Sequence, residues 1–312
     1  MTRAPVARGA RLRAQAKINL SLRVLARAVD GYHQLETIFQ RITLADTVVV
    51  TVTSGSRSLD MTGATGVPVE RNLAWRAALE YERRAGWPSG WHIEIGKRIP
   101  VGGGLGGGSA DAGATLRLLN RLNPNPLGGQ ALLDMAVGIG ADVPFLAASA
   151  PLALAWGRGE RLLALPALPT RPVALLIFPF GVSTAEAFGW LAESRETGTG
   201  SPMQAVLLQP ERLRNWNGIA SVAANDLEPM VFARHGELAD GLELLAERVA
   251  SRSGVARGEV IARMTGTGST LFSIPVAGPL APSLAGGVEW PGGGRVVLTE
   301  TAARVEEVEL IE

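Results

Sequence analysis

The most constraining feature of the sequence is the segment from Gly102 to Gly108, where six of seven residues are glycine. The residues after it have the leucine spacing of a helix, at Leu116, Leu119 and Leu122. A glycine-rich turn that opens a helix gathers backbone N–H groups at the positive end of the helix dipole. Glycine also lets phosphate oxygens approach the backbone closely. We therefore predict a phosphate-binding loop that leads into a helix beginning at Ser109.

The two common phosphate-binding fingerprints do not fit this loop. A P-loop ends in Gly-Lys-Ser/Thr, whereas here Gly108 is followed by Ser109 and Ala110. A dinucleotide fingerprint requires an acidic residue about 20 positions further on, and only Asp134 lies near that position. The plain alternative is a flexible glycine turn that binds no ligand. Six glycines ahead of a serine make this alternative the weaker one.

Composition excludes several classes of protein. With 46% hydrophobic and 19% charged residues, the 312-residue chain is expected to fold compactly, as two domains or one large α/β domain. Its formal charge of +1 provides no overall attraction to nucleic acid or anionic lipid. The chain has no cysteine, no apolar run of the roughly 20 residues that span a bilayer, and no secretory signal. We expect a cytoplasmic protein with no nucleic-acid or membrane partner.

The basic residues are unevenly divided between the two types. Of 30 basic residues only Lys17 and Lys97 are lysine, which leaves 28 arginines. Lysine is a compact charge with a tunable pKa, so its retention at two positions marks both as candidates for function. The arginine-rich N-terminus, with Arg3, Arg8 and Arg11 among its residues, has the composition of a transit peptide but is expected to be a frayed basic tail.

Hydrophobic periodicity predicts strands interleaved with helices. In the first half we expect strands at 17–24, 46–53 and 91–97, a helix from the cap Asn72 to about Arg84, a helix at 130–137, and a turn that presents Asp142 just before Pro144. The strand at 17–24 alternates apolar and polar residues, so it is expected to be half-buried with Lys17 and Asn19 on one face.

A proline cluster at 165–172 marks a candidate linker. Beyond it we expect a buried strand at 173–178, a helix at 238–250, a strand, glycine turn and strand over 260–274, and surface loops at 197–201 and 292–294. The predicted division is therefore an N-terminal domain over residues 1–167 and a C-terminal domain over 168–312.

The glycine loop, in the string PVGGGLGGGSA, resembles the ATP motif of the galactokinase, homoserine kinase, mevalonate kinase and phosphomevalonate kinase (GHMP) superfamily. Within it, AKINLSLRVLARAVDGYHQLETIFQ resembles the branch that phosphorylates a cytidylated methylerythritol in non-mevalonate isoprenoid synthesis. The similarity extends to KRIPVGGGLGGGSADA, IGADVPF, NDLEP and MTGTGSTLF. The departures are mild: Asp111 and Gly113 stand where small or amide residues are expected, and Thr270 where cysteine is frequent.

The resemblance implies a mixed α+β kinase. Its N-terminal domain would be of the ribosomal-protein-S5-domain-2-like type and its C-terminal domain ferredoxin-like, with the active site between them. The implied reaction transfers phosphate from ATP, with Mg²⁺, to the 2-hydroxyl of the cytidylated substrate, giving the 2-phosphate and ADP. The expected partner is this small molecule with its cytidine diphosphate group, and the chain is expected to be a monomer or weak homodimer.

Two residues are predicted to be catalytic, and each has a plainer alternative. Asp142 would orient or deprotonate the attacking hydroxyl, although in isolation a carboxylate in this turn is more often a helix cap. Lys17 would keep Asp142 ionised and compensate the charge that develops during transfer; otherwise it is a solvated strand lysine. The three dispersed histidines do not form a metal site, and we predict no protein-built metal site.

The resemblance assigns the remaining candidates to two groups. The predicted nucleotide-binding residues are Asn72, Lys97, Pro100, Val101, Gly102, Gly103, Gly104, Leu105, Gly106, Gly107, Gly108, Ser109 and Ala110. The predicted substrate-binding residues are Asn19, Tyr32, His33, Thr184, Gly266, Thr267 and Gly268. Tyr32 would stack on the cytosine and His33 would hydrogen-bond its edge, whereas a hairpin turn that packs an aromatic is the alternative. Asn72 and Ser109 are alternatively simple helix caps, and Lys97 a solvated strand end.

Three other functions remain open from the sequence. A related GHMP kinase for homoserine or mevalonate would not need the Tyr32 and His33 pocket. A catalytically silent nucleotide sensor on the same fold would not need both Lys17 and Asp142. A structural interaction module would leave the glycine loop unexplained.

Overall fold

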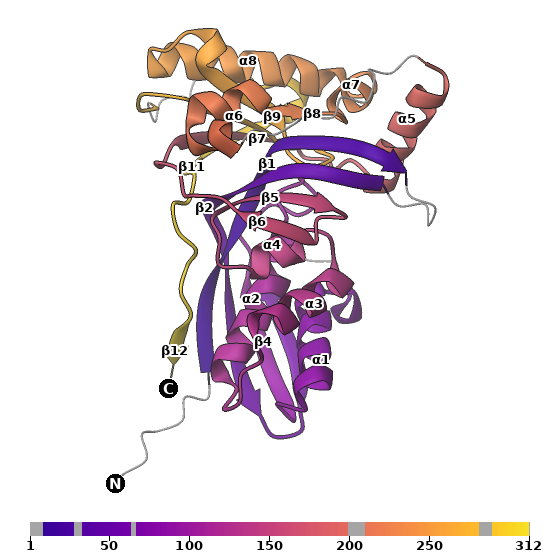
Figure 1. Ribbon diagram of the computed structural model, residues 1–312, viewed down its shortest axis with the longest axis vertical. Coiled ribbons are helices and arrows are strands. Elements are labelled where there is room, and N and C mark those ends of the chain that lie inside the picture. The colour runs from indigo at the N-terminus through magenta and orange to yellow at the C-terminus, as the bar shows by residue number, and fades with distance from the viewer. Residues whose placement is uncertain (1–8, 28–32, 64–66, 199–209, 281–288, 312) are drawn as a thin grey trace.

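The computed structural model describes residues 9–27, 33–63, 67–198, 210–280 and 289–311. Its larger sheet has the order β12-β1-β2-β4-β3, with β5 also on β2, β6 on β5, and β8 on β1. The strands are β1 (Gly9–Arg27), β2 (His33–Thr53), β3 (Arg57–Thr62), β4 (Gly90–Gly96), β5 (Leu152–Gly157), β6 (Arg161–Ala164), β8 (Ala224–Asn225) and β12 (Glu309–Ile311). In Figure 1 the long β1 and β2 run from the lower part of the molecule to the upper.

The second sheet is antiparallel, in the order β11-β7-β10-β9. Its strands are β7 (Pro172–Ile177), β9 (Val260–Met264), β10 (Leu271–Pro275) and β11 (Arg295–Glu300). The helices are α1 (Leu73–Ala85), α2 (Gly107–Leu122), α3 (Gly129–Ile139), α4 (Val143–Ala147), α5 (Thr184–Glu196), α6 (Trp216–Val222), α7 (Glu228–Phe232) and α8 (Gly236–Ser253). Helices α1 to α4 lie in the lower part of Figure 1 and α8 lies across the top. The mixed α+β class is confirmed.

The chain crosses between the two sheets more than once. Residues beyond 168 build the second sheet, yet β8 and β12 return to pair with β1 of the first. The division at 167/168 therefore stays a prediction. Among the described helices none is long and apolar enough to cross a membrane.

The N-terminal arginines were predicted wrongly as part of a frayed tail. Strand β1 begins at Gly9, eight residues before the predicted start, and pairs with both β2 and β12. Arg11 contacts Glu309 at 2.5 Å and Arg13 contacts Glu306 at 3.3 Å. The carboxylates that order these arginines come from the other end of the chain, so no local pattern reveals them. Arg3 and Arg8 lie outside the described residues.

Strand β1 is buried on both faces over residues 17–22, so the prediction of a half-buried strand at 17–24 was wrong. Lys17, Asn19 and Ser21 are each about 3% exposed, like the apolar residues between them. The polar face is covered because the Lys17 N–H donates to Leu105 in the glycine loop and the Asn19 N–H donates to Thr265. Both covering segments are distant in sequence. A polar strand face thus becomes the floor of a site instead of a solvated surface.

The helix after the glycine loop begins earlier than predicted. Gly106, with φ 72°, precedes helix α2, and the N–H of Ala110 donates to its carbonyl at 2.8 Å. Helix α2 therefore starts at Gly107, and Ser109 is its third residue instead of its cap. The cap predicted at Asn72 is confirmed, because its side chain accepts the N–H of Ala74 at 2.9 Å. The predicted helices at 130–137 and 238–250 and the strand at 173–178 are also confirmed.

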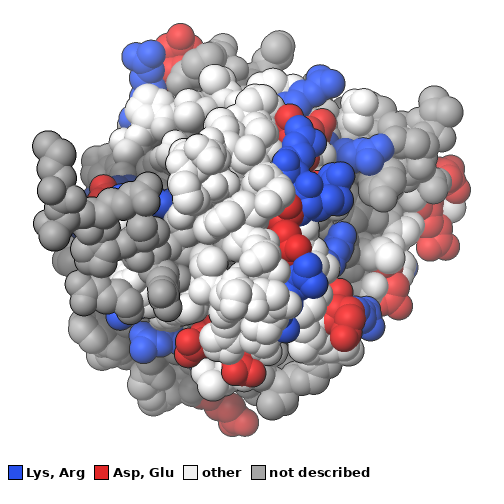
Figure 2. Space-filling view, turned by 90° about the horizontal axis from the view of Figure 1, so that it is seen from below, with Lys and Arg blue, Asp and Glu red and all other residues white. Residues whose placement is uncertain are grey.

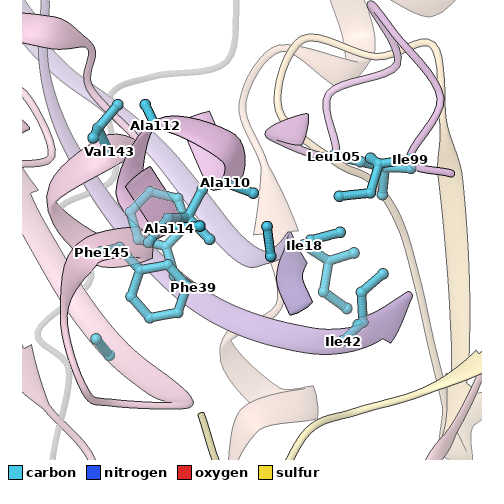
Figure 3. Packing of buried hydrophobic residues seen from close by; sticks show 14 of the residues in the cluster. Ile18, Phe39, Ile42, Ile99, Leu105, Ala110, Ala112, Ala114, Val143 and Phe145 are labelled. Atoms are coloured by element: carbon cyan, nitrogen blue, oxygen red, sulfur yellow. The ribbon is translucent and has the colours of Figure 1, made fainter. Parts of the chain in front are cut away.

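Close packing of apolar side chains supports the polar face of β1 (Figure 3). Phe39 of β2 stacks on Phe145 of α4 with ring centroids 4.9 Å apart, and Ala110 and Ala114 of α2 lie beside them. Gly113 allows α2 to approach α4, because a Cβ there would lie 2.6 Å from the Leu146 carbonyl carbon. This contact explains the glycine that departs from the family pattern.

The surface seen from below in Figure 2 carries charges of both signs. Acidic and basic side chains alternate along a band beside a broad uncharged area. On this face the interspersed charges fit the small net charge of the chain and give no extended field of one sign.

Candidate active site

Lys17 and Asp142 form an ion pair in a cleft beside the glycine loop, which both residues line together with Asn19. Nζ of Lys17 lies 3.2 Å from Oδ2 of Asp142. The lysine side chain is 3% exposed, whereas the aspartate is 29% exposed. Lys17 is thus a fixed charge in the floor of the cleft, and Asp142 is the member of the pair that a ligand can reach.

Asp142 lies at the N-terminus of α4, as predicted, but it does not cap the helix. It has helical dihedral angles and its side chain makes no capping hydrogen bond. The alternative of a plain helix cap is therefore excluded by the geometry. The carboxylate is left to face Lys17 and the cleft.

Arg41 of β2 holds the other end of α4. Its buried guanidinium donates to the carbonyls of Phe145 at 2.8 Å, Ala148 at 2.9 Å and Ala150 at 3.2 Å. Burial, with a smaller effect of nearby Arg117, lowers the pKa of Arg41 to about 9. A cation at a helix C-terminus satisfies the last carbonyls and interacts favourably with the helix dipole. Arg41 therefore fixes the short helix that carries Asp142.

Asn19 is the polar hub of the cleft floor. Its Oδ1 accepts hydrogen bonds from Lys17 Nζ at 2.7 Å, the Gly266 N–H at 3.0 Å and Thr265 Oγ1 at 3.2 Å. Its Nδ2 donates to Thr37 Oγ1 at 2.8 Å. The side chain was predicted to contact substrate, and here its hydrogen-bonding groups are engaged by the protein. Its Oδ1 holds Lys17 Nζ in place, and because Asn19 also lines the larger hollow, the predicted substrate contact stays a prediction.

Glycine is required in the loop by close contacts. Gly104 has φ 78°, and a Cβ there would lie 2.2 Å from the Thr265 carbonyl oxygen. A Cβ at Gly106 would lie 3.1 Å from the side chain of Lys17. The loop therefore packs against the turn of the second sheet on one side and against the catalytic candidate on the other.

The N-terminus of α2 supplies donors to the same cleft. The N–H groups of Gly107, Gly108 and Ser109 precede the first intrahelical bond, which Ala110 makes. Gly107, Gly108 and Ser109 line the cleft together with Lys17 and Asp142. A helix start of this kind favours an anion such as phosphate.

Two hollows meet at the glycine loop. The larger, of about 460 Å³, contains Lys17, Asn19 and Asp142 and is large enough for a substrate of small-molecule size. The smaller, of about 150 Å³, lies on the other side of the loop. The predicted nucleotide-binding residues that line the smaller one are Asn72, Lys97, Pro100, Val101, Gly102, Gly103, Gly104, Leu105, Gly106, Gly107 and Gly108. Ala110 lines neither, because its side chain is buried in the core (Figure 3).

Lys97 is engaged by two carboxylates. Its Nζ contacts Asp46 and lies 2.7 Å from Oδ2 of Asp111, and all three side chains are nearly fully buried. Burial, reinforced by Asp46 and opposed by Lys97, raises the pKa of Asp111 to about 7. Burial lowers the pKa of Lys97, but Asp111 and Asp46 outweigh it and raise that pKa overall. The alternative of a solvated strand end is thus wrong for Lys97.

Besides Asn19, which also lines the larger hollow, the predicted substrate residues divide into three sets. Thr184 and the turn from Gly266 to Gly268 line the larger hollow, where the Oγ1 atoms of Thr184 and Thr267 are 3.4 Å apart. Tyr32 lies outside the described residues. The backbone of His33 begins β2, but its side chain is outside the described part, so the predicted cytidine pocket stays a prediction.

Several residues of the site were not found from the sequence. Arg41, Asp46 and Arg158 stand in no motif that the sequence analysis singled out. Arg41 and Asp46 act through residues distant in sequence, and Arg158 lines the larger hollow. Asp111 carried a signal, since it departs from the family pattern, but that departure was interpreted as neutral. Thr270, the other departure, is fully buried, and Oγ1 has no hydrogen-bond partner among the described residues.

Comparisons with known proteins agree with the geometry. Residues 72–150 match the model of the GHMP kinases N terminal domain. A relative from Moorella thermoacetica, a 4-diphosphocytidyl-2-C-methyl-D-erythritol kinase, is 38% identical over 276 residues, covering 88% of this chain and 93% of the relative. A protein of the same name from Heliobacterium modesticaldum is 35% identical over 314 residues, covering 95% and 96%.

Solved structures agree as well. A crystal structure of a 4-(cytidine 5'-diphospho)-2C-methyl-D-erythritol kinase is 33% identical, with a TM-score of 0.68, and the similarity covers 93% of this chain and 98% of that one. A homoserine kinase from Cytophaga hutchinsonii has a TM-score of 0.65 at 15% identity over the full length of both chains, which shows the fold alone.

The protein is an ATP-dependent small-molecule kinase of the GHMP type, as defined by its two-sheet fold, the glycine loop before α2 and the cleft beside that loop. Within this class, the chain is 35–38% identical to two 4-diphosphocytidyl-2-C-methyl-D-erythritol kinases over most of its length and theirs. The chain belongs to the 4-diphosphocytidyl-2-C-methyl-D-erythritol kinase family.

Proposed function

We propose that this enzyme transfers the γ-phosphoryl group of ATP to the 2-hydroxyl of 4-diphosphocytidyl-2-C-methyl-D-erythritol, giving the 2-phosphate and ADP for isoprenoid precursor synthesis. The observation that carries the mechanism is the Lys17–Asp142 pair, held at 3.2 Å in the cleft that also contains the N-terminus of α2. Phosphoryl transfer requires positioning and neutralisation of charge more than covalent participation by the protein.

The nucleotide side of the proposal rests on the glycine loop. The nucleoside is expected in the smaller hollow, beside Asn72 and the exposed Val101, and the phosphates at the N–H groups of Gly107 to Ser109. The γ-phosphate would then lie where the two hollows meet. This places it on the same side of the loop as Lys17.

The acceptor side rests on Asp142. Its carboxylate orients the 2-hydroxyl and accepts the proton while the hydroxyl oxygen forms a bond to the γ-phosphorus. The bond from that phosphorus to the bridging oxygen breaks, and ADP leaves with the electron pair. Lys17, fixed by Asn19 and Asp142, offsets the negative charge on the moving group.

Among the described residues no cluster of three or more acidic or histidine side chains could hold a metal ion. A Mg²⁺ ion that is coordinated mainly by phosphate oxygens and water needs no such cage. The Ser109 hydroxyl and the exposed carboxylate of Asp142 are oxygen ligands on the same hollow and fit this ion. Bound there with ATP, Mg²⁺ would neutralise phosphate charge.

The cytidine end of the substrate is expected beyond the catalytic pair. Leu22, Leu35 and Phe188 form an apolar wall of the larger hollow, and Leu35 follows closely on Tyr32 and His33. These two residues are the predicted cytosine contacts, and Thr184 and Thr267 are the predicted contacts of the diphosphate. A homoserine or mevalonate kinase would not need this region.

The test is an ADP-release assay with the cytidylated substrate beside mevalonate, homoserine and unsubstituted methylerythritol phosphate. We expect turnover of the cytidylated compound to exceed that of each competitor by orders of magnitude. Faster turnover of any competitor would refute the specific assignment in favour of another GHMP kinase. ATP binding without turnover of any of the four would favour the catalytically silent sensor.

A further inference from the structure

The segment Asn225 to Glu228 belongs to the NDLEP motif and takes no part in the mechanism described above. Asn225 is 5% exposed, and its strand β8 pairs with β1 at Leu22. Its Nδ2 donates to the carbonyls of Met264 and Gly266, both at 2.8 Å, and its Oδ1 accepts the Leu227 N–H at 3.0 Å. A buried amide with donors and acceptor satisfied is a rigid connection.

Gly266 is held by side-chain amides on both sides of its Cα. Its N–H donates to Oδ1 of Asn19 at 3.0 Å, and its carbonyl accepts from Asn225. The residue has φ 59°, a conformation that glycine adopts readily. Asn225 therefore fixes the orientation of Gly266 through its carbonyl, and Asn19 accepts a hydrogen bond from the Gly266 N–H on the other side.

The orientation of the Asn19 carboxamide determines whether an oxygen acceptor or an N–H donor faces Lys17 Nζ. With Nδ2 donated to Thr37, Oδ1 faces Lys17 Nζ. Rotating the carboxamide by half a turn would place its NH₂ group against the ammonium and against the Gly266 N–H, which are donors too. The Gly266 N–H therefore helps to keep the acceptor turned toward the catalytic lysine.

We propose that Asn225 is a positioning residue for phosphoryl transfer. It acts through a hydrogen-bonded series that runs from Asn225 to Gly266, Asn19 and Lys17, and so to Asp142. The same series fixes the turn whose Thr267 lines the substrate hollow. The proposal rests on the proposed function, since it assigns Lys17 and Asp142 to the chemistry.

Asp226, the next residue, provides a matched contrast. Its carboxylate accepts the Val24 N–H at 3.0 Å and pairs with Arg23 at 2.8 Å, so it fastens the segment to β1. Its hydrogen bonds among the described residues do not include the glycine turn. If the motif served stability alone, weakening either residue would affect the enzyme in the same way. If Asn225 positions the turn, only its substitution should affect turnover.

The experiment compares Asn225→Ser, Asn225→Asp and Asp226→Asn with the wild type. Serine is smaller than asparagine, whereas aspartate keeps the shape and the hydrogen bond from the Leu227 N–H but loses the two N–H donors. Thermal melting identifies which Asn225 variant is folded, and kcat is measured on that variant. We expect kcat to fall about tenfold or more for either Asn225 variant, with the KM for ATP within about twofold. Asp226→Asn should lower the melting temperature and leave kcat within about twofold.

A double-variant cycle tests the route of the effect. In an Asn19→Ala background, adding Asn225→Ser should change kcat by less than about twofold, because the connection to Lys17 is already broken. A full tenfold fall in that background, or unchanged kcat in the single variants, would overturn the proposal. Wild-type enzyme inactive on the cytidylated substrate would instead refute the proposed function, and with it the basis of this inference.

Discussion

The two lysines of the chain have opposite surroundings. Within the described part of the chain Lys17 pairs with one carboxylate, Asp142, which is 29% exposed and lines the larger hollow. Lys97 has two, Asp46 and Asp111, and both are buried. Each lysine contacts the glycine loop: a Cβ at Gly106 would meet Lys17, and a Cβ at Gly107 would lie 3.3 Å from Lys97 Nζ. One lysine faces the cleft and the other lies beneath the helix start.

The difference shows what a buried lysine contributes in each setting. A pair with one exposed member can exchange contacts with a substrate, so its charge is available for chemistry. A lysine between two buried carboxylates is saturated, and it balances charges that would otherwise be unpaired. The rarity of lysine indicated both positions but not this division of roles. Substitutions at the two lysines and at their carboxylate partners test it, beginning with the largest expected effect.

Replacing Lys97 with methionine should unfold the protein more readily without a direct effect on chemistry. Asp46 and Asp111 would be left facing each other without a cation, and breaking a buried pair costs about 3–5 kcal/mol. Chemical denaturation measures the loss. The double variant Lys97→Met/Asp111→Asn should recover part of it, because one of the unpaired carboxylates is removed. Unchanged stability in Lys97→Met would contradict the structural role.

Asp142→Asn should affect the enzyme in the opposite way. Turnover is expected to fall by at least about 10²-fold, because the amide cannot accept the hydroxyl proton, while ATP affinity stays nearly intact. Single-turnover kinetics and nucleotide titration separate the two. Asp134→Asn on the exposed face of α3 is the matched control and should be silent. Near-normal activity of Asp142→Asn would remove Asp142 from the mechanism.

Lys17→Arg keeps the charge but changes its shape. The lysine stem lies against Gly106, and a longer, planar guanidinium cannot keep the position that Nζ holds between Asn19 and Asp142, so we expect kcat to fall about tenfold. Arg13→Lys, the reverse exchange at the exposed end of the same strand, should leave kcat unchanged. Equal kcat for Lys17→Arg and wild type would show that only the charge matters.

The last comparison concerns the pH dependence of stability. The pKa of Asp111 is raised from its ordinary 3.8 to about 7, so the folded protein keeps a proton that the unfolded chain releases. Its contribution is full below about pH 4 and is lost as the pH rises toward 7, with a slope of at most about 1.4 kcal/mol per pH unit. Glu228, also raised to about 7 by burial, acts with the same sign.

Asp111→Asn should therefore flatten the fall in stability between pH 4 and 7, as measured by denaturation at several pH values. Glu228→Gln keeps an acceptor for the Met264 N–H and should remove the part of the pH dependence of stability that Glu228 contributes. If neither substitution changed the pH dependence of stability, the two buried carboxylates would have to be ionised throughout this range in the folded protein.

Much of the fold could be predicted because its signals are local. The cap Asn72, the alternation in β4 and the apolar run of β7 each depend on neighbours within a few residues. Other elements gave no local signal. Strand β12 has three residues and exists because β1 offers an edge to it, and β8 has two. The start of α2 was misplaced because Gly106 replaces a side-chain cap with its own backbone conformation.

The sequence by itself determined a phosphate-binding loop and several members of the site, because six clustered glycines, two rare lysines and Asp142 before a proline are local patterns with chemical meaning, and the motifs around them carried the resemblance to the kinase family. Only the tertiary structure decided how they work together. It covers both faces of the middle of β1, so that Lys17 becomes a buried, directed charge. It also gives Lys97 two buried carboxylates, whereas Lys17 pairs with the partly exposed Asp142. Burial and the direction of hydrogen bonds depend on segments hundreds of residues apart, such as Asn19 and Gly266, and no local pattern contains them.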